Sequence, residues 1–261
     1  MTTISIPLLV QGIGAVALEA EELGEGSPFL LLHGGAGPAS MRGFAELLAG
    51  RGGARVIVPT HPGFALTDRP PALSDVPALA SLYSALLEAL SLDGVTVIGN
   101  SVGGWIAAEL GLLNDPRVTQ LVLVDAVGLA VPGHPVTDVQ GMAVPEIMRL
   151  SFHDPTPFLR DPASLSDRER AVQATNQAAL SIYAPNMADP ELGKRLLELK
   201  IPTLVIWGAS DGIVDSTYGR AYSEAIPSSC FEVLAGTGHM PQMESPELLL
   251  RAISRDGPQA L

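Results

Sequence analysis

Apolar and polar positions follow two different periods along this chain, and each period predicts a different kind of element. A β-hairpin comes first, because Ile4–Val10 and Val16–Glu21 are extended patterns joined across two glycines. From Phe29 onward, short unbroken apolar runs predict strands buried on both faces, and apolar residues at helical spacing predict amphipathic helices. The strands are predicted at Phe29–Leu32, Arg55–Val58, Val95–Ile98 and Val118–Val124, and the helices at Met41–Ala49, Val76–Leu92 and Val102–Leu113. Such alternation builds a parallel sheet with helices on both faces.

The alternation stops after Asp125 and resumes near residue 200. The intervening stretch is rich in proline and shows several short helical patterns but no clear strand. Strand and helix patterns then return at Thr203–Trp207, Thr217–Ala225, Phe231–Leu234 and Pro246–Ile253. We therefore predict an α/β core formed by residues 1–127 and 200–261, with residues 128–199 inserted as a helical cap.

Composition and charge narrow the class of protein. With 47% hydrophobic residues, 27 glycines and 22 prolines, the chain can form a large core with many turns. Its 28 acidic and 15 basic residues give a formal net charge of −13, and no Lys/Arg cluster occurs, which argues against nucleic acid and against an anionic membrane as partners. The single cysteine, Cys230, allows no intramolecular disulfide and is predicted as a buried strand residue.

Targeting and cofactor signals are not found. The first lysine or arginine is Arg42, so the N-terminus lacks the charged region of a secretory signal, and the apolar runs are too short to span a membrane. A cytoplasmic protein is therefore expected. The pattern Gly12-x-Gly14-x-x-Ala17 matches a dinucleotide-binding fingerprint, but it lies in the predicted hairpin and not between a strand and a helix. We expect no organic cofactor and no metal.

A Gly-x-Ser-x-Gly pattern at Gly99–Gly103 is the strongest local signal. It follows the predicted strand Val95–Ile98 and begins the helix predicted from Val102. A strand–turn–helix of this kind is a nucleophile elbow, in which small neighbours allow a strained serine to present its Oγ above the sheet. Ser101 is thus the predicted nucleophile. The alternative is a glycine-rich turn whose serine only caps the helix.

The loop His33-Gly34-Gly35-Ala36 follows directly after the predicted strand Phe29–Leu32. It can bring the Gly35 N–H opposite the N–H of Val102, which lies at a helix N-terminus. Two such donors form an oxyanion hole, and each is worth about 3–4 kcal/mol in acyl transfer. We predict that Gly35 and Val102 are these donors and that His33 braces the loop.

The base and its acid are predicted on two later loops. His239 lies after the last strand and before the last helix, where a histidine can reach the serine across the carboxyl ends of the strands. Asp211, on the turn after the penultimate strand, is predicted to orient the imidazole. Asp125, at the end of the strand before the insertion, remains a candidate for that role. Asp215 is predicted to be a cap or a first-turn acid of the next helix, and His61 to be structural.

These motifs, together with Trp207-Gly-x-x-Asp211 and Gly238-His239-Met240-Pro241, resemble the α/β-hydrolase superfamily over nearly the whole chain. The order Ser101, Asp211, His239 is also that of the superfamily. The resemblance implies an α/β-hydrolase fold, which is a mostly parallel sheet of eight strands with a cap inserted after strand six.

Within the superfamily, His33–Pro38 and Gly99-Asn100-Ser101 are similar to the meta-cleavage-product hydrolases, which split C–C bonds. Those enzymes typically carry a tryptophan after the catalytic histidine and a substrate-binding arginine in the cap. This chain has Met240 after the histidine, and Arg149 and Arg160 lie in its cap outside any motif that we can match. Haloalkane dehalogenases and epoxide hydrolases have an aspartate nucleophile where this chain has Ser101, which argues against both of these classes.

The leading hypothesis is a carboxylesterase-like serine hydrolase that cleaves a small, apolar ester through an acyl-enzyme. A C–C hydrolase is the first alternative, with a cofactor-free perhydrolase or lyase and a ligand-binding protein behind it. The only expected partner is a small-molecule substrate, and a homodimer stays open. The predicted substrate contacts are Gly34, Asn100, Phe152 and Met240. Phe152, with Phe158, Ile147, Met148 and Leu150, forms either an apolar pocket over the serine or the cap's own small core.

Overall fold

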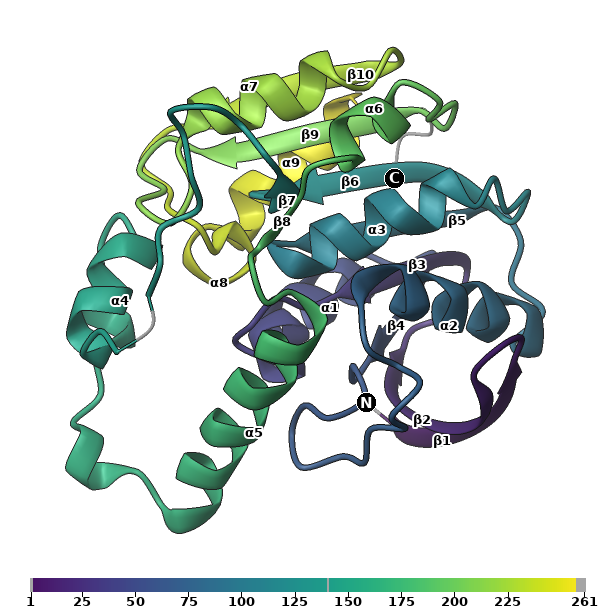
Figure 1. Cartoon of the computed structure of the whole chain (residues 1–261), viewed down its shortest axis with the longest axis horizontal. Helices are drawn as coiled ribbons and strands as arrows, with labels where there is room; N and C mark the ends of the chain where they lie inside the picture. The colour runs from purple at the N-terminus through teal and green to yellow at the C-terminus, as the bar shows by residue number, and fades with distance from the viewer. Residues whose placement is uncertain (1, 140, 257–261) are drawn as a thin grey trace.

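An eight-stranded sheet forms the centre of the molecule in a computed structural model that describes residues 2–139 and 141–256 (Figure 1). Strand β2 runs antiparallel to β1 and β4, and all other neighbours in the sheet are parallel. The predicted hairpin and the mostly parallel sheet of eight strands are confirmed. The order across the sheet is β1 (Thr2–Val10), β2 (Gly14–Leu23), β4 (Ala54–Pro59), β3 (Ser27–Leu32), β5 (Val95–Asn100), β6 (Val118–Val124), β9 (Thr203–Gly208) and β10 (Ser229–Leu234).

Successive side chains of the central strands enter two different apolar cores, because side chains alternate across a sheet. Leu121 and Leu123 of β6 lie in one core, and Val122 and Val124 lie in the other. Helices cover both faces of the sheet (Figure 1). The first core packs against α2 (Val76–Ala89), α3 (Val102–Leu112), α6 (Leu192–Leu196) and α7 (Ser216–Glu224), and the second against α1 (Arg42–Gly50) and α9 (Pro246–Asp256).

The ends of the helices follow from local chemistry. The Asp75 side chain accepts from the Ala78 N–H at 2.8 Å and begins α2. The helix ends before the predicted Leu92, because Ser91 adopts a left-handed φ of 49°. The Asp215 side chain accepts from two backbone N–H groups at the start of α7, so its predicted capping role is confirmed. The short helices η1 (Pro38–Met41) and α8 (Pro241–Glu244) precede α1 and α9.

The inserted stretch, residues 128–199, lies between β6 and β9, and most of its elements are helices. Its longest helix, α5, begins with a capping box between Ser166 and Glu169. Two strands of two residues each pair in parallel, although no strand was predicted here; a pair this short leaves no periodic pattern in the sequence. Its elements are β7 (Gly128–Leu129), α4 (Val144–Ser151), η2 (Thr156–Phe158), η3 (Pro162–Ser164), α5 (Asp167–Tyr183), β8 (Ala188–Asp189) and α6.

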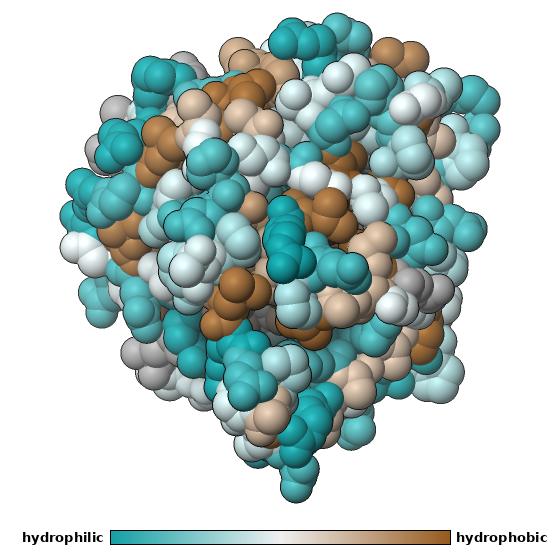
Figure 2. Space-filling view, turned by 90° about the vertical axis from the view of Figure 1, so that its left-hand side faces the viewer, coloured by the Kyte–Doolittle hydropathy of each residue, from teal (hydrophilic) through white to brown (hydrophobic). Residues whose placement is uncertain are grey.

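The side of the molecule that carries α4 and α5 presents apolar patches among polar ones (Figure 2). The large apolar residues exposed in the inserted stretch are Met142, Val144, Leu159, Ile182 and Leu197. Within residues 2–139 and 141–256, no helix combines the length and the apolar character needed to cross a membrane.

The prediction that Cys230 is buried is wrong, since its side chain is exposed. The residue does lie in a strand, β10, but this strand is at the edge of the sheet and pairs only with β9. Within β10 only Leu234 is buried. The apolar run therefore predicted the strand correctly. It did not predict that the strand lies at the edge of the sheet, where most of its side chains are at least partly exposed.

Candidate active site

Ser101 lies in the turn between β5 and α3, with φ 57° and ψ −121°. This backbone conformation is strained for any residue with a Cβ. The turn is tight because α3 packs directly against the end of β3. A Cβ on Gly103 would lie 2.2 Å from the Leu32 carbonyl oxygen, so only glycine permits this approach. The geometry is that of a nucleophile elbow.

The peptide between Gly34 and Gly35 lies beside this serine. The Gly34 carbonyl oxygen accepts from His33 Nδ1 at 2.8 Å. In a trans peptide the N–H points opposite to the carbonyl, so the Gly35 N–H points away from His33. Among the described residues, neither the Gly35 N–H nor the Val102 N–H has a hydrogen-bond acceptor. A Cβ on Gly34 would lie 3.0 Å from the Ser101 Cβ, which shows how close the two loops are.

Behind this loop lies a buried chain of hydrogen bonds that the sequence pattern did not indicate. His33 Nε2 accepts from the His61 N–H at 3.1 Å, so the His33 proton is on Nδ1. His61 Nε2 donates to the His33 carbonyl at 2.8 Å, and its Nδ1 contacts the Tyr83 hydroxyl. Burial lowers the pKa of His61 to about 4, and burial together with the neighbouring His61 lowers the pKa of His33 well below its usual value. Both rings are neutral and brace the loop.

These two histidines make stability depend on pH. Each is neutral when folded, whereas the unfolded chain takes up a proton on each below pH 6.5, so unfolding binds protons between pH 6.5 and about 4. The free energy of unfolding is therefore expected to fall as pH falls through this window, by up to about 1.4 kcal/mol per pH unit for each histidine. Urea unfolding of the protein and of His61→Gln across this range measures the slope. The His61→Gln variant should show a weaker slope. The control variant His153→Gln removes an exposed histidine whose ring bonds to the neutral Ser210 hydroxyl, and it should keep the full slope. Equal slopes in all three proteins would contradict the explanation.

Asp211 and His239 meet from the loops that follow β9 and β10. Asp211 Oδ2 lies 2.7 Å from His239 Nδ1, and both side chains are buried. Asp211 Oδ1 accepts from the N–H groups of Ile213 and Val214 at 2.8 and 3.0 Å, which fixes the orientation of the carboxylate. His239 Nε2 is then left to accept a proton. Ser101 Oγ makes no hydrogen bond to any described residue, and serine–histidine contacts of this kind commonly tighten only with substrate.

Asn100 joins the serine and histidine loops. Its Nδ2 donates to the His239 carbonyl at 2.9 Å and to the Val124 carbonyl at 3.2 Å, and its Oδ1 accepts from Gln242 Nε2 at 3.0 Å. The side chain is 2% exposed. These contacts occupy the whole amide, so they favour a role in positioning His239 over the substrate contact predicted for Asn100. Gln242, which supports it, carried no signal in the sequence.

The inserted stretch contacts both triad loops through its backbone. The Ser151 carbonyl accepts from the His239 N–H at 2.8 Å, and the Leu150 carbonyl accepts from the Gly212 N–H at 2.9 Å. A Cβ on Gly238 would lie 2.5 Å from the Ser151 oxygen, which explains the glycine before the histidine.

Phe152 and Met240, two of the predicted substrate contacts, are both buried. Phe152 stacks on Phe158 with ring centroids 4.1 Å apart. The stack joins two of the apolar residues for which a pocket over the serine and a small core of the cap were the alternatives. Gly35 is covered by α5, since a Cβ there would lie 2.9 Å from a methyl group of Leu180.

Asp125 lies next to the Asp211–His239 pair. One ligand atom from each of these three buried side chains lies within 4.8 Å of the others, the only such group in the described part of the chain. A metal ion there would compete with the bond between His239 Nδ1 and Asp211, so the group is better explained as part of the triad. Asp125 makes no hydrogen bond to His239, which leaves Asp211 as the partner of the imidazole.

Three ionisable residues of the inserted stretch, Arg149, Arg160 and His153, contact groups other than Ser101. Arg149 lines a surface hollow with Met142, Glu146 and Leu150. Arg160 donates to Glu169 at 2.8 Å, and His153 Nδ1 lies 2.8 Å from the Ser210 hydroxyl.

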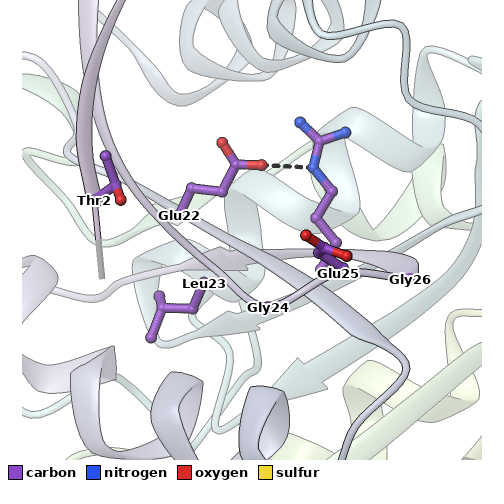
Figure 3. A pocket seen from close by; sticks show the side chains of 7 residues that line it. Thr2, Glu22, Leu23, Gly24, Glu25 and Gly26 are labelled. Atoms are coloured by element: carbon purple, nitrogen blue, oxygen red, sulfur yellow. Dashed lines mark hydrogen bonds and ion pairs between the residues drawn. The ribbon is translucent and has the colours of Figure 1, made fainter.

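A polar hollow of about 590 Å³ is lined by residues around Glu22 and Arg55 (Figure 3), at the ends of the parallel strands opposite to those that carry Ser101 and His239. Its lining comes from the start of β1, the end of β2, the turn before β3 and the start of β4, and it includes an ion pair of 2.6 Å between Glu22 and Arg55. Ligands of parallel α/β sheets bind at the carboxyl ends of the strands, where Ser101 and His239 lie. The hollow is therefore separate from the candidate site. Its lining residues are Thr2, Glu22, Leu23, Gly24, Glu25, Gly26 and Arg55.

Residues 29–252 match the sequence profile of the alpha/beta hydrolase family. The chain belongs to this family. Among curated alpha/beta hydrolases it resembles the 2-hydroxy-6-oxononadienedioate/2-hydroxy-6-oxononatrienedioate hydrolase 2 of Pseudomonas putida, with 28% identity over 90% of both sequences. A 2-hydroxymuconate semialdehyde hydrolase of Pseudomonas putida is also 28% identical, over 88% of this chain and 86% of the relative.

Two solved structures align with nearly the whole chain. A thermophilic esterase from Thermogutta terrifontis aligns with a TM-score of 0.76 and 26% identity, covering 98% of this chain and 97% of that one. A meta-cleavage product hydrolase from Pseudomonas fluorescens IP01 shares the fold, with a TM-score of 0.74 and 24% identity over 95% and 97% of the two chains.

Proposed function

We propose that this alpha/beta hydrolase cleaves a small, largely apolar ester through an acyl-enzyme on Ser101. The observation that carries the proposal is the buried Asp211–His239 pair, 2.7 Å apart, whose histidine loop is bonded to Asn100 next to the strained Ser101. Burial and two backbone donors hold the Asp211 carboxylate, and this carboxylate keeps the His239 proton on Nδ1.

In the proposed reaction, Ser101 Oγ attacks the carbonyl carbon while His239 Nε2 takes the serine proton. The N–H groups of Gly35 and Val102 stabilise the oxyanion. The imidazolium then gives its proton to the leaving alkoxide, and an acyl-serine remains. Water attacks the acyl-serine with His239 again acting as base, which releases the acid and restores the serine.

C–C bond cleavage is the second candidate, because the names of several relatives describe hydrolases of 2-hydroxy-6-oxo dienoates. Such a substrate carries a carboxylate, and a carboxylate taken out of water needs a cation or several donors. The two arginines of the inserted stretch that could bind a carboxylate have other neighbours. Arg149 lines a surface hollow, and Arg160 donates to Glu169. This arrangement favours a neutral ester over an anionic dienoate.

Turnover of 4-nitrophenyl esters of short acids, measured beside turnover of a 2-hydroxy-6-oxo dienoate, tests the proposal. We expect kcat/KM to be larger for the esters by orders of magnitude. Arg149→Ala and Arg160→Ala serve as matched variants and should leave ester turnover unchanged, because both side chains point elsewhere. Faster cleavage of the dienoate, lost in either arginine variant, would replace ester hydrolysis by C–C hydrolysis as the function.

A further inference from the structure

A buried carboxyl group that the proposed reaction does not use lies beside the triad. Asp125 follows β6, is fully buried, and adopts a left-handed φ of 47° that few non-glycine residues take. Its Oδ1 accepts from the Gly208 N–H at 2.7 Å. Its Oδ2 is buried and, as a carboxylate oxygen, receives no hydrogen bond from any described residue. Buried polar atoms in native proteins are nearly always satisfied, so this oxygen requires an explanation.

The neighbouring carboxyl group supplies the explanation. Asp125 and Asp211 lie within 4.8 Å of each other and of the His239 ring, and two buried carboxylates so close cannot both be charged. Asp211 has three partners that stabilise its charge, namely two backbone N–H groups and His239 Nδ1. Asp125 has one, from Gly208. The proton therefore belongs on Asp125. Burial, and then the charge of Asp211, raise the pKa of Asp125 well above its usual value.

We propose that Asp125 is a positioning residue whose protonated Oδ2 donates a hydrogen bond to the Asp211 carboxylate. The inference rests on the proposed function, since it concerns the same triad. The bond gives the buried Asp125 Oδ2 a partner. It also supplies Asp211 with a further hydrogen-bond donor, which comes from the residue after β6. It also withdraws part of the Asp211 charge, so that Asp211 orients His239 without holding its imidazolium too tightly.

Besides the two aspartates, the described titratable groups that contact the loops around His239 are Glu244 and His153. Glu244 accepts from the Gly238 N–H at 2.7 Å and from the His153 N–H at 3.1 Å. The His153 ring contacts Ser210. These groups stay the same in variants of Asp125, so a change in the titration of His239 reports on Asp125.

The direction of one pH shift tests the proposal. The rate of Ser101 labelling by a fluorophosphonate should rise as the pH is raised, because His239 must be unprotonated to act as the base. The pH range of this rise is the acidic limb of the profile. Asparagine tolerates a left-handed φ, can accept from Gly208 and can donate to Asp211, so Asp125→Asn should move this limb by less than about 0.3 pH unit. Asp125→Ala removes the donor, so labelling should slow about tenfold, the worth of roughly one hydrogen bond, and the limb should move to higher pH.

An ionised Asp125 would give the opposite result. Asp125→Asn would then remove a negative charge beside the imidazolium and move the limb to lower pH by about one unit, which would overturn the proposal. An unmoved limb and rate in Asp125→Ala would overturn it as well. If Asp125→Ala fails to fold, the Asn variant alone decides by the direction of its shift. If even the wild-type protein is not labelled, the proposed function fails, and an NMR titration of His239 Cε1–H in the same variants still tests Asp125 without any substrate.

Discussion

Replacing Ser101 with alanine is expected to lower kcat for ester hydrolysis by about 10⁵–10⁶-fold, because the proposed acyl-enzyme has no other acceptor. The turn should survive, since the backbone of the elbow is held by Gly103 and by hydrogen bonds from the Gly104 and Trp105 N–H groups to the residue 101 carbonyl. Thermal unfolding should therefore stay near that of the wild-type protein. Intact-mass spectrometry after fluorophosphonate treatment should show an adduct on the wild type and none on Ser101→Ala.

A matched control is Ser181→Ala, which removes an exposed serine of α5 whose hydroxyl bonds only to the Gln177 carbonyl. This variant should label and turn over like the wild type. Labelling of Ser101→Ala at the wild-type rate would place the nucleophile elsewhere. It would also leave the strained backbone at Ser101 without the functional reason that the proposal gives it.

The parts of the fold that local patterns determine were predictable. The bounds predicted for β6 are those observed, because this segment of seven residues is rich in β-branched and apolar side chains and stands within an alternation of strand and helix patterns. The elbow was predictable because its signal is local as well: the glycines that the turn requires lie within the turn itself. The position of His239 followed from chain order, because a loop after the last strand reaches the carboxyl ends of its neighbours.

The contacts between distant segments were not predictable from local patterns. Asn100 bonds to His239 and Gln242 across about 140 residues, and nothing in its own neighbourhood indicates which way its amide turns. The bonds from His61 to His33 and Tyr83 depend in the same way on how two loops meet. Exposure of Cys230 depends on the order of strands in the sheet, which a single apolar run does not contain.

The two aspartates illustrate the same limit at the site. Their positions after β6 and β9 made both of them candidates for the acid, because these strands are neighbours in the sheet. Their side-chain hydrogen bonds distinguish the two residues. Asp211 bonds to the imidazole of His239, whereas Asp125 bonds to the Gly208 N–H. A carboxyl group that looked like a rival in the sequence is thus better explained as support for the acid.

Replacing Asp211 with asparagine is expected to lower kcat by about 10⁴-fold with little loss of stability. The Ile213 and Val214 N–H groups require an acceptor at Oδ1, so the new amide nitrogen must take the place of Oδ2 and face His239 Nδ1. An N–H donor at that point makes Nδ1 an acceptor and moves the ring proton to Nε2, and this tautomer cannot take the proton of Ser101. Steady-state kinetics with thermal unfolding measures both effects.

Asp215→Asn is the matched control for this substitution, since Asp215 is exposed, caps α7 through the Thr217 and Tyr218 N–H groups, and asparagine caps equally well. Activity should be retained. An Asp211→Asn variant that keeps activity within about tenfold of the wild type would mean that the tautomer is set by another carboxylate, contrary to the 10⁴-fold loss expected from a misplaced proton. Asp125 is the only described side chain close enough for that, so adding Asp125→Asn to Asp211→Asn would then abolish the remaining activity. If Asp211→Asn instead lowers kcat by the expected 10⁴-fold, Asp211 is the carboxylate that orients the imidazole, and Asp125 acts on the imidazole only through Asp211.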